Sequence, residues 1–293
     1  MMELDLNDIL NLDSLTEMLK GAFALDAHEQ MIQIADQLYT CAYSVYEERQ
    51  LQRAKGERLA TYLFKHNIIY YLGFSLMAKG IALQKLFKLG ESRNCIEKYS
   101  KLGWVNELDK EGQEEVDYYK TTARANTYTL DLLEGKEEVL EEYVNFISES
   151  EEEELLPGII TILESAIMHN FNVDHILTKF GEKIERRGDY YETKENIRYY
   201  VDYLYLLSIY RFKENKHEIA INVILKVLVT SDKLRDDTGF KKICVLFESF
   251  RTYASQEQLE EYTSISKKIL KGDLKNEKSI KGIVFDGDRI FTS

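Results

Sequence analysis

The chain has 293 residues, of which 44% are hydrophobic and 30% charged, with only one proline and 15 glycines. This composition is typical of a folded and mostly helical protein, because proline and glycine are the strongest helix breakers. The net charge of −13 argues against binding of nucleic acid by this chain alone, since clustered Lys and Arg bind phosphate backbones.

The cysteines and the first residues indicate the compartment. Cys41, Cys95 and Cys244 are far apart and odd in number, which predicts reduced thiols and neither a disulfide framework nor a zinc site. The first eight residues carry acidic side chains where a signal peptide carries basic ones, and no apolar run approaches membrane-spanning length. We therefore expect a cytoplasmic protein that does not act at a membrane.

In chain order, the first helix is expected to open at residues 14–17, which have the Ser-x-x-Glu pattern of a capping box. A second helix follows Asp26, where apolar residues recur with helical spacing from Met31 to Val45. The charged stretch 47–58 either continues that helix in solvent or breaks it. An aromatic-rich helix is expected over residues 59–79.

The segment 74–102 carries the clearest fold signal. It predicts two amphipathic helices joined by a turn at residues 89–91, with the small residues Ala82 and Cys95 where the helices cross closely. This is the pattern of a tetratricopeptide-type helical hairpin, whose repeat is about 34 residues. Such a hairpin cannot bury its apolar face alone, so neighbouring hairpins stack into a superhelix with a concave surface.

Further helices follow this hairpin. A second clear hairpin spans residues 199–228, with its turn at residues 215–218 and Ala220 at the close crossing. Pro157 suits the start of a helix, where its missing N–H is not needed. The other expected helices cover residues 116–134, 139–147, 157–169, 172–187, 239–253 and 256–270.

The predicted fold is therefore all-α, a right-handed superhelix of degenerate tetratricopeptide-like hairpins. We expect one helical-repeat domain over residues 1–271 and a C-terminal tail over residues 272–293. Residues 283–291 alternate around an Asp-Gly pair, so this tail forms either a small hairpin or a loose end.

Motifs for catalysis are missing from the sequence. The five histidines form no HExxH pair, and no phosphate-binding glycine loop or GxSxG motif occurs. Residues 283–288 resemble the DxD start of haloacid-dehalogenase-like phosphatases, but too few residues follow for that domain. We predict no catalytic residues, no metal site, no cofactor and no enzymatic activity.

Polar and aromatic side chains of the expected inner helices are the candidates for binding. Asparagine and arginine can hydrogen-bond the backbone or carboxylate of an extended peptide, and tyrosine offers flat pocket walls. A broader set also includes Tyr70, Phe74, Tyr118, Arg124 and Arg211. The predicted peptide-binding residues are Asn67, Tyr71, Asn126, Tyr128, Arg198 and Tyr205.

Four strings carry a resemblance to a known group: YLGFSLMAKG (71–80), CIEKYSKLGW (95–104), KTTARANTYTLDLL (120–133) and LPGIITILESA (156–166). Over about residues 15–270 the chain resembles the C-terminal tetratricopeptide-like regulatory region of helix-turn-helix transcription regulators from Bacillus-type bacteria and their phages. These are similar to the peptide-pheromone receptors of the RRNPP group. Residues 1–25 are too short and too acidic for the helix-turn-helix module of about 60 residues.

Three functions are compatible with these observations. The first is a non-enzymatic sensor that binds a short peptide in a concave groove, as the resemblance implies, with homodimer formation as an open alternative. The second is an adaptor that docks a partner protein without a peptide ligand. The third is a Rap-like regulator that assists dephosphorylation of a response regulator, although nothing like the N-terminal bundle of such proteins is evident. Asn and Arg in a groove favour the first function, and a broad apolar patch on the convex face would favour the second.

Overall fold

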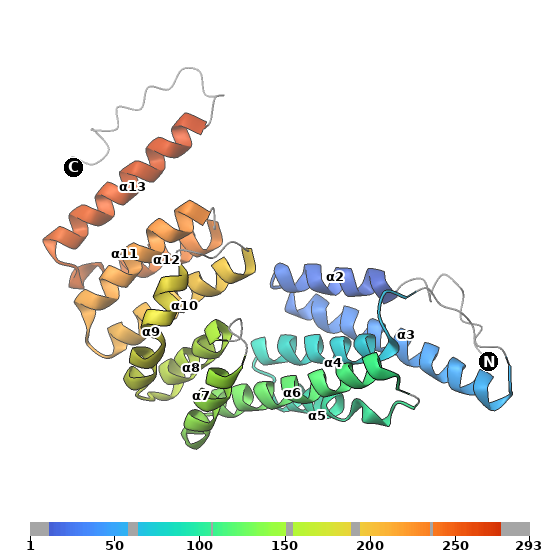
Figure 1. Cartoon of the computed structure of the whole chain (residues 1–293). Helices are drawn as coiled ribbons and strands as arrows, with labels where there is room; N and C mark the ends of the chain where they lie inside the picture. Colours follow the sequence, from blue (N-terminus) through green and yellow to red (C-terminus); the bar gives the residue numbers. More distant parts are fainter. Residues whose placement is uncertain are drawn as a thin grey trace. The chain divides into compact units, whose positions relative to one another are not determined.

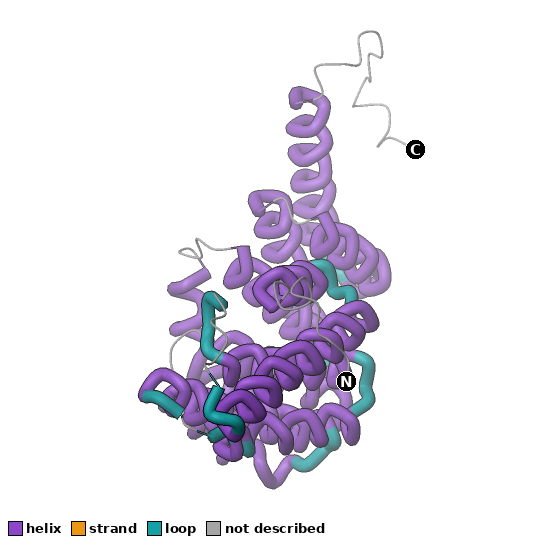
Figure 2. Tube along the Cα trace, turned by 90° about the vertical axis from the view of Figure 1, so that its right-hand side faces the viewer, coloured by secondary structure: helices purple, strands orange, loops and turns teal. Residues whose placement is uncertain are grey.

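The computed structural model describes residues 12–57, 64–106, 108–150, 155–188, 194–234 and 237–276. These residues form helices joined by short connections, and no strand occurs among them (Figure 2). The all-α prediction is therefore confirmed. The tail hairpin expected over residues 283–291 lies outside the described residues.

Contacts divide the chain into two compact units, Met1–Phe146 and Ile147–Ser293, where the sequence predicts one domain over residues 1–271 (Figure 1). The first unit contains α2 (Leu12–Ala24), α3 (His28–Ala54), α4 (Ile68–Lys85), α5 (Leu89–Ser100), η1 (Leu102–Trp104), α6 (Lys110–Leu133) and η2 (Glu137–Val139). Helix α7 (Leu140–Glu149) crosses the boundary between the units. The second unit contains α8 (Leu155–His169), α9 (Asp174–Gly188), α10 (Lys194–Lys213), α11 (His217–Leu234), α12 (Asp237–Phe250), η4 (Arg251–Tyr253) and α13 (Gln256–Asn276).

Helix α4 is central to the first unit and contacts α2, α3, α5 and α6. Three tyrosines, Tyr71, Tyr99 and Tyr119, are buried in the core between these helices. Helix α6 lies close to α4 at Gly73, where a Cβ atom would lie 2.1 Å from Cε2 of Tyr119. The Tyr119 hydroxyl donates a hydrogen bond of 3.0 Å to the carbonyl of Tyr70. The glycine thus makes room for a ring that joins the two helices.

A turn with one left-handed residue recurs after several helices. After α4, Phe87 has φ +57°, the Lys88 N–H donates to the Leu83 carbonyl, and the Phe87 N–H donates to the Gln84 carbonyl. These two bonds define a Schellman motif, which satisfies the last carbonyl groups of a helix. Asp26, Gly56, Gly135 and Asn215 occupy the same left-handed position after α2, α3, α6 and α10.

The turn of the first predicted hairpin therefore lies at residues 86–88, not 89–91, and α5 begins at Leu89. The close crossing of that hairpin involves Gly80, because a Cβ atom there would lie 3.4 Å from the Cβ atom of Cys95. The Ser92 hydroxyl also donates to the Gly80 carbonyl at 2.8 Å. The predicted small residue Cys95 is at the crossing, and Ala82 is buried in the same core.

In the second unit, α10 packs against α8 and α11. The N–H of Val173, just before α9, donates a hydrogen bond of 3.1 Å to the buried hydroxyl of Tyr210 on α10. Ala220 on α11 is fully buried, as the predicted close crossing requires. The rings of Phe247 and Tyr262 stack at 3.7 Å and join α12 to α13.

Several predicted helix starts need correction. Helix α4 begins at Ile68, where Asn67 caps it, so residues 64–67 do not belong to the helix expected over 59–79, whose first residues lie outside the described ranges. The charged stretch after Val45 continues α3 as far as Ala54. Helix α6 begins six residues before the predicted residue 116, since Asp109 is its cap. The predicted capping box is wrong: Ser14 lies inside α2.

Candidate functional site

Asn67 is the cap of α4. Its Oδ1 accepts a hydrogen bond of 2.9 Å from the Tyr70 N–H and so satisfies one of the first backbone donors of the helix. Its Nδ2 is buried and has no hydrogen-bond partner. Asn67, which the sequence predicts as a ligand contact, is thus a helix cap whose Nδ2 has no hydrogen-bond partner.

Tyr71 cannot be a pocket wall in this conformation, because its side chain is fully buried. Its hydroxyl donates to the Asp13 carboxylate on α2 and accepts a hydrogen bond of 3.3 Å from the His66 N–H. Burial and the bond to Asp13 both raise the pKa of the Tyr71 hydroxyl. Tyr71 therefore fixes the segment before α4 against α2.

Asn126 and Tyr128 lie two positions apart on α6, about 200° around the helix. Asn126 Nδ2 donates a hydrogen bond of 2.8 Å to the buried Tyr99 hydroxyl, which links α6 to α5. Tyr128 lies instead beside Tyr143 and Phe146, with ring centroids 5.8 Å away in both cases. These two predicted residues do not face a common ligand.

The last two predicted residues belong to α10 in the second unit. Arg198 lies in this helix, but its side chain is outside the described residues. Tyr205 is half-buried, and its carbonyl accepts a hydrogen bond of 2.7 Å from the Ser208 hydroxyl. Arg211, from the broader set, pairs with Asp174 at the start of α9. The four predicted residues of the first unit, Asn67, Tyr71, Asn126 and Tyr128, therefore do not converge on one site.

A different group of rings does gather on the first unit. His66, Tyr70 and Phe74 are four residues apart, and their rings stack in sequence, with centroids 4.0 Å and 5.5 Å apart. Tyr70 and Phe74 are half-buried, and Tyr118 on α6 is 54% exposed. We call His66, Tyr70, Phe74 and Tyr118 the aromatic strip.

Charged side chains from α2 and α6 flank the aromatic strip. Burial raises the pKa of the Tyr70 hydroxyl. The charge of Lys20 lowers this pKa, and the charges of Glu115 and Glu17 raise it. Burial likewise raises the pKa of the Glu115 carboxyl. Residues of α2, α4 and α6 thus lie near one another on one surface.

A pocket of about 200 Å³ lies elsewhere in the first unit, between α3, the start of α4 and the start of α6. Arg49 and Arg53 lie on its α3 side, and Asn67, Asn106 and Asp109 come from the other walls. We call it the Asn67 pocket. The two arginines were not predicted, although their spacing of four residues within the charged stretch 47–58 is the signal for a common helix face.

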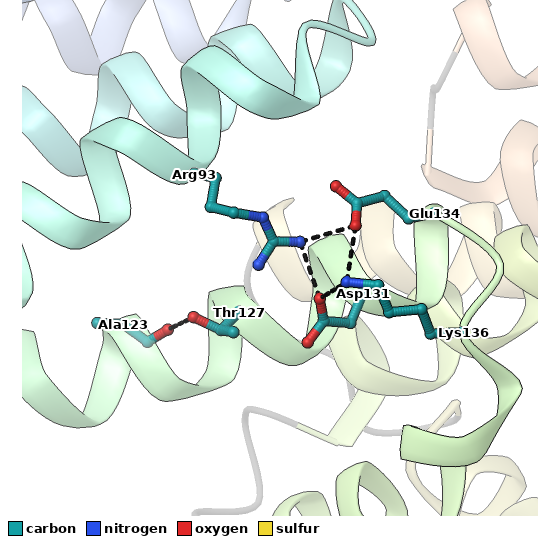
Figure 3. Close-up of polar contacts among 6 residues, drawn as sticks. All are labelled: Arg93, Ala123, Thr127, Asp131, Glu134 and Lys136. Atoms are coloured by element: carbon teal, nitrogen blue, oxygen red, sulfur yellow. Dashed lines mark hydrogen bonds and ion pairs between the residues drawn. The ribbon is translucent and has the colours of Figure 1, made fainter.

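Another polar cluster joins α5 to the end of α6 (Figure 3). Arg93 contacts Asp131 at 2.8 Å and Glu134 at 2.9 Å, and Lys136 contacts the same two carboxylates at 2.7 and 2.9 Å. Two cations and two anions balance here. Nearby, the Thr127 hydroxyl bonds to the Ala123 carbonyl within α6. This cluster holds the turn at Gly135 and offers no unbalanced charge to a ligand.

Metal-ligating residues do not gather within the described ranges: no three His, Cys, Asp or Glu side chains are placed to share an ion. None of the described helices has the length and apolarity needed to cross a bilayer. Comparisons with protein-family models, with curated proteins and with solved structures found no match.

Proposed function

We propose that this chain is a non-enzymatic regulatory protein of the cytoplasm that binds a short peptide along the aromatic strip. In this proposal α2, α4 and α6 are the inner helices of a right-handed tetratricopeptide-like superhelix. The chain is then related to the regulatory region of RRNPP-type transcription regulators. The resemblance of residues 71–80, 95–104, 120–133 and 156–166 supports that relationship.

The aromatic strip is the observation that carries the proposal. Flat rings that lie side by side and are partly exposed offer a peptide contact area at little cost in conformational entropy. Tyr70 and Phe74 are already held by stacking, with nearly parallel rings (5°), so they need no ordering when a ligand binds.

The charges around the strip favour a basic peptide. Glu17 and Glu115 outnumber Lys20 among the charged side chains that act on Tyr70, and the whole chain carries a net charge of −13. A negative surface attracts cationic partners and speeds their association. Lys and Arg side chains also bind favourably over aromatic rings.

The experiment is a binding screen of the full chain against random peptides of about five to ten residues, in a basic pool and an acidic pool. We expect binders from the basic pool, and we expect Tyr118→Ala to weaken the best binder about tenfold, or about 1.4 kcal/mol. Tyr253→Ala is the matched control, because Tyr253 is 52% exposed and lies in the second unit. Equal losses in both variants, or no binder in either pool, would refute the peptide proposal.

The adaptor function is favoured by a separate observation on α2. Met18 on α2 is 56% exposed and Leu25, the first residue after this helix, is 80% exposed, so both present an apolar face to solvent. A protein partner would cover such a face. Binding of a partner protein that is lost in Met18→Lys and kept in Tyr118→Ala would establish the adaptor instead of the peptide sensor.

A further inference from the structure

Glu115 lies on the face of α6 that packs against α4. Three positions earlier, a Cβ atom at Gly112 would lie 3.6 Å from Cδ1 of Ile69, in the first turn of α4. Four positions later, the Tyr119 hydroxyl donates to the carbonyl of Tyr70 at 3.0 Å. Residues three and four apart share one face of a helix, so Glu115 is held beside the start of α4 and next to the aromatic strip.

The charge of Glu115 acts on the rings around it. Burial raises the pKa of the Tyr119 hydroxyl, and the Glu115 carboxylate raises it further. Burial and this carboxylate likewise both raise the pKa of Tyr70, a ring of the aromatic strip. Burial also raises the pKa of the Glu115 carboxyl itself, and the charge of His66 opposes that shift. The carboxylate is thus close to the strip and partly withdrawn from water.

Glu115 differs in its pairing from Glu17, the other acidic side chain that acts on Tyr70. Glu17 pairs with Lys20 at 3.0 Å. Glu115 is half-buried, and among the residues that the structure describes it forms no hydrogen bond and no ion pair. A carboxylate that is partly withdrawn from water without a cation is unfavourable, and a bound cation would remove that cost. The place for a ligand cation is therefore at Glu115 and not at Glu17.

The ring next to Glu115 is suited to a flat cation. Tyr118, three positions after Glu115, is 54% exposed and packs edge-on against the buried Tyr119, with centroids 5.1 Å apart. A guanidinium is planar, so it can stack on such a ring and at the same time direct two N–H groups to a carboxylate. An ammonium is a compact, strongly hydrated charge that offers no flat face to a ring. Arginine therefore fits this pair of side chains better than lysine does.

We propose that Glu115 and Tyr118 bind one arginine side chain of the peptide, with the guanidinium stacked on the Tyr118 ring and hydrogen-bonded to the Glu115 carboxylate. This site rests on the proposed peptide function for the source of the arginine. It narrows the ligand from any basic peptide to one that carries arginine at the position beside Glu115.

The test follows the backbone amide signals of α6 in the ¹⁵N-labelled full chain by NMR. The probes are the N-acetyl amides of arginine, lysine and citrulline, of which citrulline keeps the planar shape of arginine without its charge. We expect the arginine probe to shift the signals of residues 115–119 and the other two to bind about tenfold more weakly. Equal binding of arginine and citrulline, or of arginine and lysine, would overturn the guanidinium site.

Glu115→Gln removes the charge and keeps the shape of the side chain. Because this carboxylate has no ion pair to lose among the described residues, the melting temperature should not fall, while the arginine probe should bind about tenfold more weakly. Glu114→Gln is the matched control, because Glu114 is the neighbouring residue of α6 but is 68% exposed and pairs with Lys110. Equal losses in the two variants would mean that only the overall negative charge attracts the probe, and would overturn the site.

Tyr118→Leu tests the ring while the carboxylate stays in place. This variant keeps an apolar side chain but loses the flat face, so its preference for arginine over lysine should disappear. A preference that stays unchanged would contradict the stacked guanidinium.

Failure of the arginine site and failure of the peptide proposal give different results. If a basic peptide from the screen binds, and citrulline in place of its arginine leaves the affinity within about twofold, the arginine site is wrong and the peptide proposal stands. If no peptide binds but the arginine probe binds in a way that Glu115→Gln abolishes, the guanidinium site stands and the peptide proposal is wrong.

Discussion

At Gly73, helix α4 has no side chain because the Tyr119 ring occupies that space. Tyr119 is buried and hydrogen-bonded to the Tyr70 carbonyl, so it cannot move aside easily. We predict that Gly73→Ala lowers the free energy of unfolding by about 1–3 kcal/mol, as overpacking does, despite the better helix propensity of alanine.

Gly21→Ala is the control for this prediction. No atom lies within 4 Å of a Cβ placed at Gly21 on α2. The same substitution there should raise stability by about 0.5–1 kcal/mol, because only helix propensity changes. Urea unfolding of both variants measures the difference, and two changes of the same sign would contradict the close approach of α4 and α6.

Phe87 occupies a left-handed backbone position, with φ +57°, yet its side chain is 63% exposed. This conformation costs an L-residue about 1–2 kcal/mol, and glycine adopts it without that cost. We predict that Phe87→Gly raises the free energy of unfolding by about 1 kcal/mol, since little burial is lost. Thermal unfolding of the variant is the measurement, and a lower melting temperature would show that the Phe87 ring contributes to packing.

Residue roles were the hardest part to predict from the sequence. Asn67 and Asn126 have the polarity of peptide contacts, but one caps α4 and the other pairs with Tyr99. Both partners are set by where helices begin and cross, which residue type alone does not specify. Exposed rings such as Tyr118 were in the broader predicted set because their spacing follows a helix face.

At the scale of helices, the cluster of Arg93, Asp131, Glu134 and Lys136 joins α5 to the end of α6 (Figure 3). Burial alone would raise the pKa of the Asp131 carboxyl, but the hydrogen bonds from Lys136 and Arg93 outweigh burial and lower it. A lowered pKa means that the cluster stabilises the fold above the ordinary pKa of the carboxyl, and that this contribution is lost as the pH falls. The loss should occur as the pH drops from about 5 towards 2.

We predict that Asp131→Asn lowers the free energy of unfolding by about 1 kcal/mol at pH 7, a value typical of partly exposed ion pairs. The difference between the variant and the wild type should shrink at pH 3, below the ordinary pKa of the carboxyl, because protonation of this carboxyl in the unfolded chain then cancels part of the stabilisation. Urea unfolding at the two pH values measures it. A difference that stays the same at both values would mean that the carboxylate charge is not what stabilises this turn.

The close crossing of the hairpins gives a further prediction. Ala82 on α4 and Ala220 on α11 are fully buried in the two units. Leucine at either position should lower the free energy of unfolding by about 1–3 kcal/mol, because the added carbon atoms have no room. Ala54→Leu, at the exposed end of α3, is the control and should leave the urea midpoint nearly unchanged.

Helix existence could be predicted well, and helix starts less well. Apolar spacing predicted the interior of α3, and Met31, Ala35, Leu38, Ala42 and Val45 are all buried in the structure. The start of α4 was missed because apolar and aromatic residues before Asn67 continue the same composition. The turn after α4 was missed because Phe87 is an unusual residue for a left-handed position.

At the scale of the whole molecule, the net charge of −13 bears on whether the chain binds DNA. We predict no detectable DNA binding by this chain alone at physiological salt, because phosphate neutralisation needs clustered cations. A gel-shift titration of the 293-residue chain with duplex DNA checks this. A sequence-specific shift would contradict the prediction.

The division into two compact units was not predicted, because the helical pattern continues on both sides of residue 146. Periodicity reports which face of a helix is buried, but not which helices share a core. All-helical architecture, in contrast, follows from the scarcity of proline and from apolar spacing along the chain.

The positions of the cysteines give each unit its own chemical reporter. None of the three cysteines forms a disulfide. Burial raises the pKa of the Cys95 thiol in the first unit and of the Cys244 thiol in the second, so little of the reactive thiolate is present while the helices are closed. The rate at which a thiol reagent modifies the buried Cys95 therefore follows the opening of the helices around it, and the rate at the half-buried Cys244 reports on the second unit. Mass spectrometry of the labelled native chain would measure the labelling rate in each of the two units separately, without an introduced probe.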